Sequence, residues 1–190
     1  MKIISKPSPA PYPFQPVLDF WFDEDTKPLW FAKSDDFDNQ LSDKFLATWQ
    51  AVTAGECAGW RETTKGAVAE IIVLDQFSRN LKRDTPQAFA YDGMALVLAQ
   101  ELLKREEFDK LPQAYQRFAL MPFMHSESKR IHERALELFE QLGDADTLAF
   151  EKKHKAIIDR FGRYPHRNAI LGRESTNEEM AFLSEPNSSF

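Results

Sequence analysis

The chain has 190 residues, a length at which a single domain buries about 70% of the surface of its unfolded chain. Its 16 Phe, 4 Trp and 4 Tyr residues exclude a largely disordered protein, because disordered chains lack so many large apolar side chains. The formal net charge of −6 argues against a broad basic surface, so we expect no nucleic-acid partner.

Several features favour a cytoplasmic protein. The longest apolar stretches reach about half of the ~20 residues that cross a membrane, so we expect no membrane association. Prolines occupy the region where a signal peptide has its apolar core. Cys57 is the only cysteine, which excludes an internal disulfide and a clustered thiolate metal site and suits a reducing compartment.

The sequence predicts one all-α domain over residues 16–185, with short extensions at both ends. Five prolines between residues 7 and 16 favour an extended arm over residues 1–15, and residues 186–190 form a tail. Strict two-residue alternation does not persist between turn signals, so we expect no sheet. Short linkers between the helices predict a bundle of antiparallel helical hairpins.

Helix boundaries are marked by Ser, Thr, Asp or Pro at starts and by Gly at stops. The apolar surface of the helix that ends near residue 80 is too broad for a solvent-exposed element, so this helix should be central. In chain order, Pro16 opens the first predicted helix, Ser34 caps the second, and the third starts at Thr63 or Thr64. The fourth starts at Thr85-Pro86, and the fifth starts at Leu111-Pro112 and is kinked or ended at Pro122. The sixth starts at Ser126 or Ser128, Asp146 caps the seventh, and Thr176 with Glu179 caps the last.

The first candidate polar cluster lies late in the central helix, over residues 75–80. Asp75 and Arg79 are four residues apart, as are Gln76 and Asn80, so two polar pairs lie on neighbouring stripes of a mostly buried helix. This arrangement fits a ligand site. It also fits a structural network in which Asp75 pairs with Arg79 and the amides satisfy nearby backbone groups.

The second candidate is the sequence His125-Ser126-Glu127, at the junction of two predicted helices. A histidine there can act as a general base, and the dipole of a helix N-terminus favours a carboxylate. Ser126 and Glu127 are equally ordinary residues for the start of a helix.

The third candidate is a basic segment in an otherwise acidic chain. Guanidinium groups bind carboxylates and phosphates in bidentate fashion, so the segment indicates a small anionic ligand. The arginines can instead pair with internal Asp and Glu side chains. The residues concerned are Arg160, Arg163, His166, Arg167, Asn168 and Arg173.

No zinc-hydrolase, Walker A, esterase or dinucleotide-binding motif occurs in the sequence. The acidic residues near positions 23–38 lack the spacing of a calcium-binding loop. We therefore expect no metal and no cofactor.

The chain resembles a bacterial family, domain of unknown function 924, which belongs to the TPR-like helical superfamily. The resemblance implies an all-α bundle of TPR-like hairpins and supplies no activity. After residue 80, Leu81 to Thr85 depart from the family pattern, in which a glycine is usual. The motifs that carry the resemblance are DFWF at 19–22, LDQFSRN at 74–80, AFAYD at 88–92, MPFMHSE at 121–127 and RFGRYPHRNAILGREST at 160–176.

These observations support a hypothesis of one shared site. We expect a pocket for a small anionic molecule or an acidic peptide end, lined by Asp75, Gln76, Arg79, Asn80, His125, Glu127, Arg163, His166, Arg167 and Asn168. In this pocket Arg167 should be open to solvent, whereas Arg79 should belong to a buried pair. A first alternative is a hydrolase or lyase with His125 or His166 as general base. A second is a structural or protein-interaction module.

Overall fold

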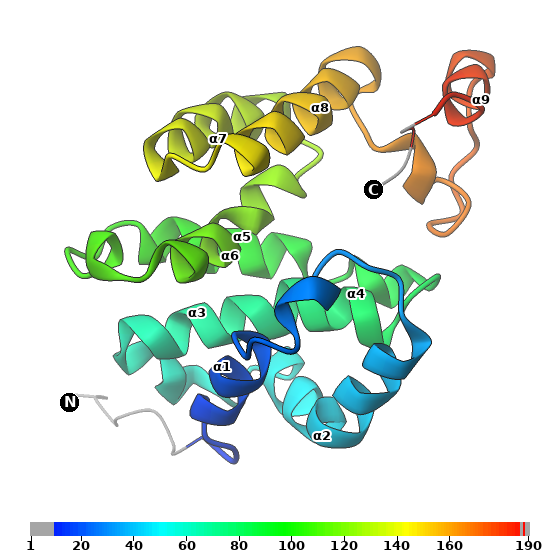
Figure 1. Cartoon of the computed structure of the whole chain (residues 1–190). Helices are drawn as coiled ribbons and strands as arrows, with labels where there is room; N and C mark the ends of the chain where they lie inside the picture. Colours follow the sequence, from blue (N-terminus) through cyan, green and yellow to red (C-terminus); the bar gives the residue numbers. More distant parts are fainter. Residues whose placement is uncertain (1–9, 187, 189–190) are drawn as a thin grey trace, which may run out of the picture.

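A computed structural model gives the fold of residues 10–186 and of residue 188 (Figure 1). Within these residues all regular structure is helical and no strand occurs, so the prediction of an all-α fold is confirmed. The α-helices are α1 (Gln15–Trp21), α2 (Asp35–Thr53), α3 (Thr64–Ile72), α4 (Ser78–Leu81), α5 (Asp92–Leu102), α6 (Gln113–Met124), α7 (Lys129–Leu142), α8 (Ala145–Phe161) and α9 (Asn177–Leu183). Short helical turns are η1 (Lys27–Leu29), η2 (Ala58–Glu62), η3 (Val73–Phe77), η4 (Pro86–Ala88), η5 (Phe108–Lys110) and η6 (Pro165–Arg167).

The helices stack in successive layers (Figure 1). Helix α3 packs against α5 and α6, α6 packs against α7, and α7 packs against α8. After α8, the chain continues through η6 to α9, and these two elements pack together. The predicted arm over residues 1–15 falls mostly outside the described residues.

The core surrounds α3, in which every residue from 66 to 72 is buried. Aromatic side chains from three other elements meet beside it. The ring of Trp21 lies 5.6 Å from that of Phe77 and 5.3 Å from that of Phe118, and all three side chains are fully buried. Burial of each ring contributes about 2 kcal/mol or more to folding. The broad apolar surface predicted for this helix is therefore confirmed.

Gly66 allows η2 to lie directly against the first turn of α3. A Cβ atom at this position would lie 2.1 Å from the backbone oxygen of Trp60, well inside van der Waals contact. Only glycine fits this close approach of two backbones.

Several predicted helix boundaries are confirmed by capping hydrogen bonds. Ser34 caps α2 and Thr63 caps α3, each through a side-chain oxygen that accepts from the backbone three residues on. Thr176 and Glu179 form the predicted capping box at the start of α9. Each such cap contributes about 1 kcal/mol.

Three boundaries differ from the prediction. Helix α5 begins at Asp92, not at Thr85, because residues 86–88 form only a single helical turn, η4. At the start of α5, the Asp92 carboxylate pairs with two arginines. Helix α6 does not end at Pro122, which was one of the two predicted outcomes, but continues to Met124, since a proline in the last turn removes only one backbone donor. Helix α8 is capped by Asp144 and not by Asp146, because the Asp144 side chain accepts from the backbone nitrogen three residues on.

Residues 73–77 interrupt the predicted central helix with a π-helical turn, η3, between α3 and α4. Such widened turns occur frequently at functional sites. Here the turn contains Asp75, the first residue of the candidate site. Among the described residues, no helix is long and apolar enough to span a membrane.

Candidate functional site

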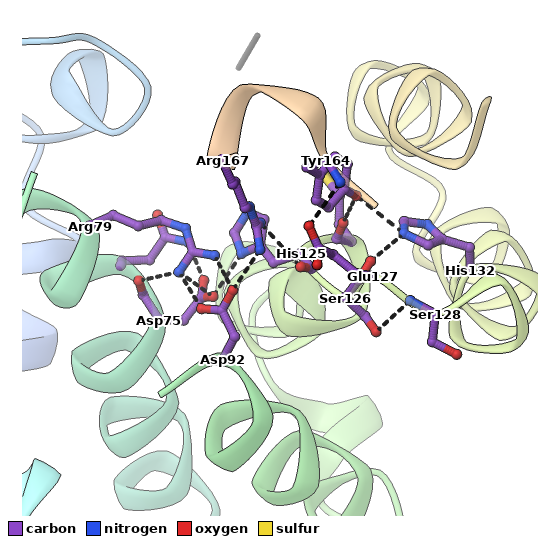
Figure 2. Close-up of polar contacts among 12 residues, drawn as sticks. Asp75, Arg79, Asp92, His125, Ser126, Glu127, Ser128, His132, Tyr164 and Arg167 are labelled. Atoms are coloured by element: carbon purple, nitrogen blue, oxygen red, sulfur yellow. Dashed lines mark hydrogen bonds and ion pairs between the residues drawn. The ribbon is translucent and has the colours of Figure 1, made fainter. Parts of the chain in front are cut away.

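Asp75 is a fully buried carboxylate with three side-chain partners (Figure 2). Its Oδ1 lies 2.7 Å from Nδ1 of His125 and 3.0 Å from Nη1 of Arg79. Gln76 donates a hydrogen bond to the other oxygen. The predicted Asp75–Arg79 pair is thus confirmed, and Asp75 also joins η3 to the end of α6.

Asp92, the first residue of α5, is shared by two arginines. Arg79 donates to both carboxylate oxygens, each at 2.9 Å. Arg167 donates to Oδ2 at 3.1 Å. The carboxylate therefore connects the central helical segment to η6, about ninety residues further along the chain.

Arg167 is buried between two aromatic rings. Its guanidinium carbon lies 4.6 Å from the centre of the Phe89 ring and 4.5 Å from that of Tyr164. Its Nη2 donates to the backbone oxygen of His125 at 3.1 Å. Only 6% of the residue is exposed, so the expectation that Arg167 is open to solvent is wrong.

We call Asp75, Arg79, Asp92, His125 and Arg167 the Asp75 cluster. Two guanidinium groups face two carboxylates, so these four side chains carry no net charge. Burial opposes ionisation of Asp75, but Arg79 and His125 outweigh it and lower the pKa of Asp75 to about 2. Burial and the charge of Arg79 lower the pKa of His125 below its usual value, although Asp75 partly counters them. His125 is therefore neutral at physiological pH, and so is the whole cluster.

One nitrogen of His125 is left for another partner. Because ionised Asp75 can only accept, Nδ1 carries the proton of the neutral ring and Nε2 has a free lone pair. Nε2 makes no hydrogen bond with the residues that the structure describes. The side chain keeps 14% of its surface exposed.

With this geometry established, similarity to known proteins identifies the family. Residues 17–187 match the family described as bacterial protein of unknown function, DUF924. The chain belongs to the DUF924 family. Among curated proteins, none matches the chain. One similar solved structure is a protein of unknown function, ATU0120 from Agrobacterium tumefaciens, with 34% sequence identity and a TM-score of 0.85 over 90% of this chain and 96% of that chain.

In this DUF924 protein, the predicted site residues separate into three groups. Those in the Asp75 cluster or bonded to it are Asp75, Gln76, Arg79, His125 and Arg167. Those in an adjacent network around Tyr164 and Arg173 are Glu127, His166 and Asn168. Those outside both are Asn80, which donates to Asp38, and Arg163, which pairs with Glu179.

In the adjacent network, Glu127 holds the segment that follows α8. Its carboxylate accepts two hydrogen bonds from Arg173, at 2.7 and 2.9 Å, and one from the backbone nitrogen of Tyr164. Burial opposes ionisation of Glu127, but these donors prevail and lower its pKa. His166 stacks near Tyr164, and burial lowers the pKa of His166 to about 4.

Every arginine of the basic segment is already paired with a carboxylate. The pairs are Arg160 with Glu178, Arg163 with Glu179, Arg167 with Asp92 and Arg173 with Glu127. The internal pairing considered for this segment is thus observed. An anion that binds here meets guanidinium groups whose charges are already balanced.

Sequence reasoning missed Asp92 and Phe89 as parts of the site. Both belong to the AFAYD motif at 88–92, so the resemblance to the family pointed to these two residues although their chemistry alone did not. Among the described residues, no three His, Cys, Asp or Glu side chains lie together in a way that could hold a metal ion.

Proposed function

We propose that the protein binds a small molecule with one negative charge, such as a carboxylate or the carboxyl end of a peptide, at Nε2 of His125. One observation carries the proposal. Asp75 holds Nδ1 of His125 at 2.7 Å and leaves Nε2 without a partner among the described residues, on a side chain that is still partly exposed.

The charges of the Asp75 cluster favour a monoanion. With His125 neutral, the cluster has no net charge, and a buried anion would be uncompensated. Protonation of His125 adds one positive charge, which a single carboxylate neutralises. A dianion such as hydrogen phosphate would leave one negative charge unbalanced.

Binding should therefore be linked to uptake of one proton by His125. Because the pKa of His125 in the free protein is lowered, the proton must be taken from solvent near neutral pH. By linkage, the affinity for the anion then rises as the pH falls toward the pKa of the free protein, by up to about tenfold per pH unit.

Thermal unfolding in acetate, at constant ionic strength and at a mildly acidic and a mildly alkaline pH, tests this proposal. A ligand that binds only the native state raises the unfolding temperature. Acetate should stabilise the protein more at the acidic pH. At the alkaline pH, where phosphate is mainly a dianion, phosphate should stabilise it less than acetate does. Calorimetric titration in buffers of different ionisation enthalpy should show uptake of one proton.

Two variants make the test specific. His125→Gln should lose the stabilisation by acetate and the proton uptake. Arg163→Gln is the matched control, because this arginine belongs to the same segment but pairs with Glu179 outside the cluster; it should bind as the wild type does. If acetate never stabilises the wild type, or if His125→Gln binds it equally well, the proposal fails and the cluster is a structural network.

The same geometry favours a second candidate, a hydrolase or lyase that uses His125 as general base. A neutral histidine with a carboxylate behind Nδ1 and a free Nε2 is suited to accept a proton from water or a substrate. Turnover of an activated ester by the wild type, lost in Asp75→Asn, would support this candidate. Equal turnover by the two proteins would exclude it.

A further inference from the structure

The backbone around His125 is held by side chains from distant parts of the chain. The last carbonyl groups of a helix have no partner within the helix. At the end of α6, three consecutive carbonyl oxygens accept from side chains instead. The donors are Oη of Tyr164 to Met124 O (2.5 Å), Nη2 of Arg167 to His125 O (3.1 Å) and Nε2 of His132 to Ser126 O (2.8 Å).

His132 must carry a proton on Nε2 for this contact. A carbonyl oxygen only accepts, so the hydrogen bond to Ser126 O requires an Nε2–H donor. Tyr164 Oη lies 3.2 Å from the same nitrogen, but its own proton is donated to Met124 O, so it also accepts here. Both neighbours therefore select the same protonated form of the ring.

The other nitrogen of His132 shares a proton with Glu151. Nδ1 lies 2.7 Å from Oε1 of Glu151, and both side chains are fully inaccessible to solvent. A nitrogen and an oxygen this close need a proton between them, whether it resides on the ring or on the carboxyl group. In either form the pair is neutral overall, as its burial demands. Burial also raises the pKa of Glu151, in agreement with retention of that proton.

We infer that His132, anchored by Glu151, is a positioning residue that holds the backbone beside His125 and so keeps the His125 ring on Asp75. The contacts form one series: Glu151 on α8 holds His132 on α7, and His132 holds the residue that follows His125. This inference names a residue that acts on the site of the proposed function, but the geometry that it asserts exists without a ligand.

Histidine-selective ¹⁵N NMR of the ligand-free protein tests the inference. In the wild type, His132 should show a proton on Nε2, and neutral His125 should show its proton on Nδ1. Glu151→Gln keeps a side-chain donor for His132 Nδ1 and should leave the tautomer and pKa of His125 unchanged. Glu151→Leu removes the partner, so the His125 ring should leave Asp75 and populate both tautomers.

Each NMR result either supports or overturns the positioning role of His132. Equal changes in the His125 signals of the two variants would assign the effect to packing at position 151. Unchanged His125 signals in Glu151→Leu would exclude a positioning role for His132. Either outcome overturns the inference. If Glu151→Leu does not fold, the wild-type spectrum decides, because a bare Nε2 on His132 contradicts the inference. Because no ligand is used, these results are independent of whether acetate binds.

Discussion

Replacement of Asp92 by Asn tests the shared carboxylate of the Asp75 cluster. The change removes one negative charge that faces two guanidinium groups, at 2.9 Å from Arg79 and 3.1 Å from Arg167. Two charges about 4 Å apart at an effective dielectric constant near 20 interact by about 4 kcal/mol. Because Asp92 and Arg79 keep 16% and 19% of their side-chain surface exposed, solvent takes up part of this loss, and we expect Asp92→Asn to cost about 3 kcal/mol.

Asp38→Asn provides a matched control. Asp38 also lies in the first turn of a helix, is 16% exposed, and binds one guanidinium through both oxygens, that of Arg83 at 2.7 and 3.0 Å. It faces one arginine instead of two, and its other side-chain partner is the neutral amide of Asn80. We expect Asp38→Asn to cost about 1–2 kcal/mol, since Arg83 is more exposed than Arg79.

Urea denaturation followed by far-ultraviolet circular dichroism measures both free energies of unfolding. The double variant Asp92→Asn with Arg167→Gln should cost less than the sum of its single variants, because removal of Arg167 relieves the surplus positive charge. If Asp92→Asn and Asp38→Asn cost the same within about 0.5 kcal/mol, or if the double variant is simply additive, the argument that one carboxylate balances two buried arginines is refuted.

Further predictions concern pH, backbone geometry and capping. Burial lowers the pKa of His154 to about 3 and that of His166 to about 4. The unfolded chain therefore binds more protons below about pH 6.5, stability falls with the pH, and the two residues should together cost about 4 kcal/mol between pH 7 and pH 5; denaturation in His154→Gln should show a smaller loss, and an unchanged slope would contradict the assignment. Gly66→Ala should cost at least about 2 kcal/mol because its Cβ would lie 2.1 Å from a backbone oxygen, whereas Gly93→Ala, with open space around it, should be neutral or stabilise by up to about 1 kcal/mol; equal effects on the melting temperature would refute this reasoning. Ser34→Ala removes the side-chain cap of α2 and should cost about 1 kcal/mol in the same denaturation assay, and no measurable loss would show that solvent replaces the cap.

The resemblance to DUF924 and the residue chemistry together predict four of the five residues of the Asp75 cluster, namely Asp75, Arg79, His125 and Arg167. The spacing of Asp75 and Arg79 predicts their pair correctly, because residues four apart on a helix lie on the same face. The place of His125 at a helix junction, where backbone groups are left for other partners, predicts it as a candidate site residue. The predicted proximity of the Asp75 pair to the basic segment is confirmed for Arg167, which shares Asp92 with Arg79. Arg163 instead pairs with Glu179 on α9.

What the sequence by itself determined is local. Capping residues, glycine stops and the period of the apolar residues fix where helices begin and end, because these effects act over a few residues. Only the tertiary structure decided which carboxylates Arg163, Arg167 and Arg173 meet. Asp92 ends a motif that looks like an ordinary helix start, and its role appears only when α5 brings it between Arg79 and Arg167. The same packing buries Arg167 and leaves Nε2 of His125 without a partner among the described residues. It also places Asp75 within a π-helical turn. These outcomes depend on contacts between residues far apart in the chain, whose energies no local pattern encodes.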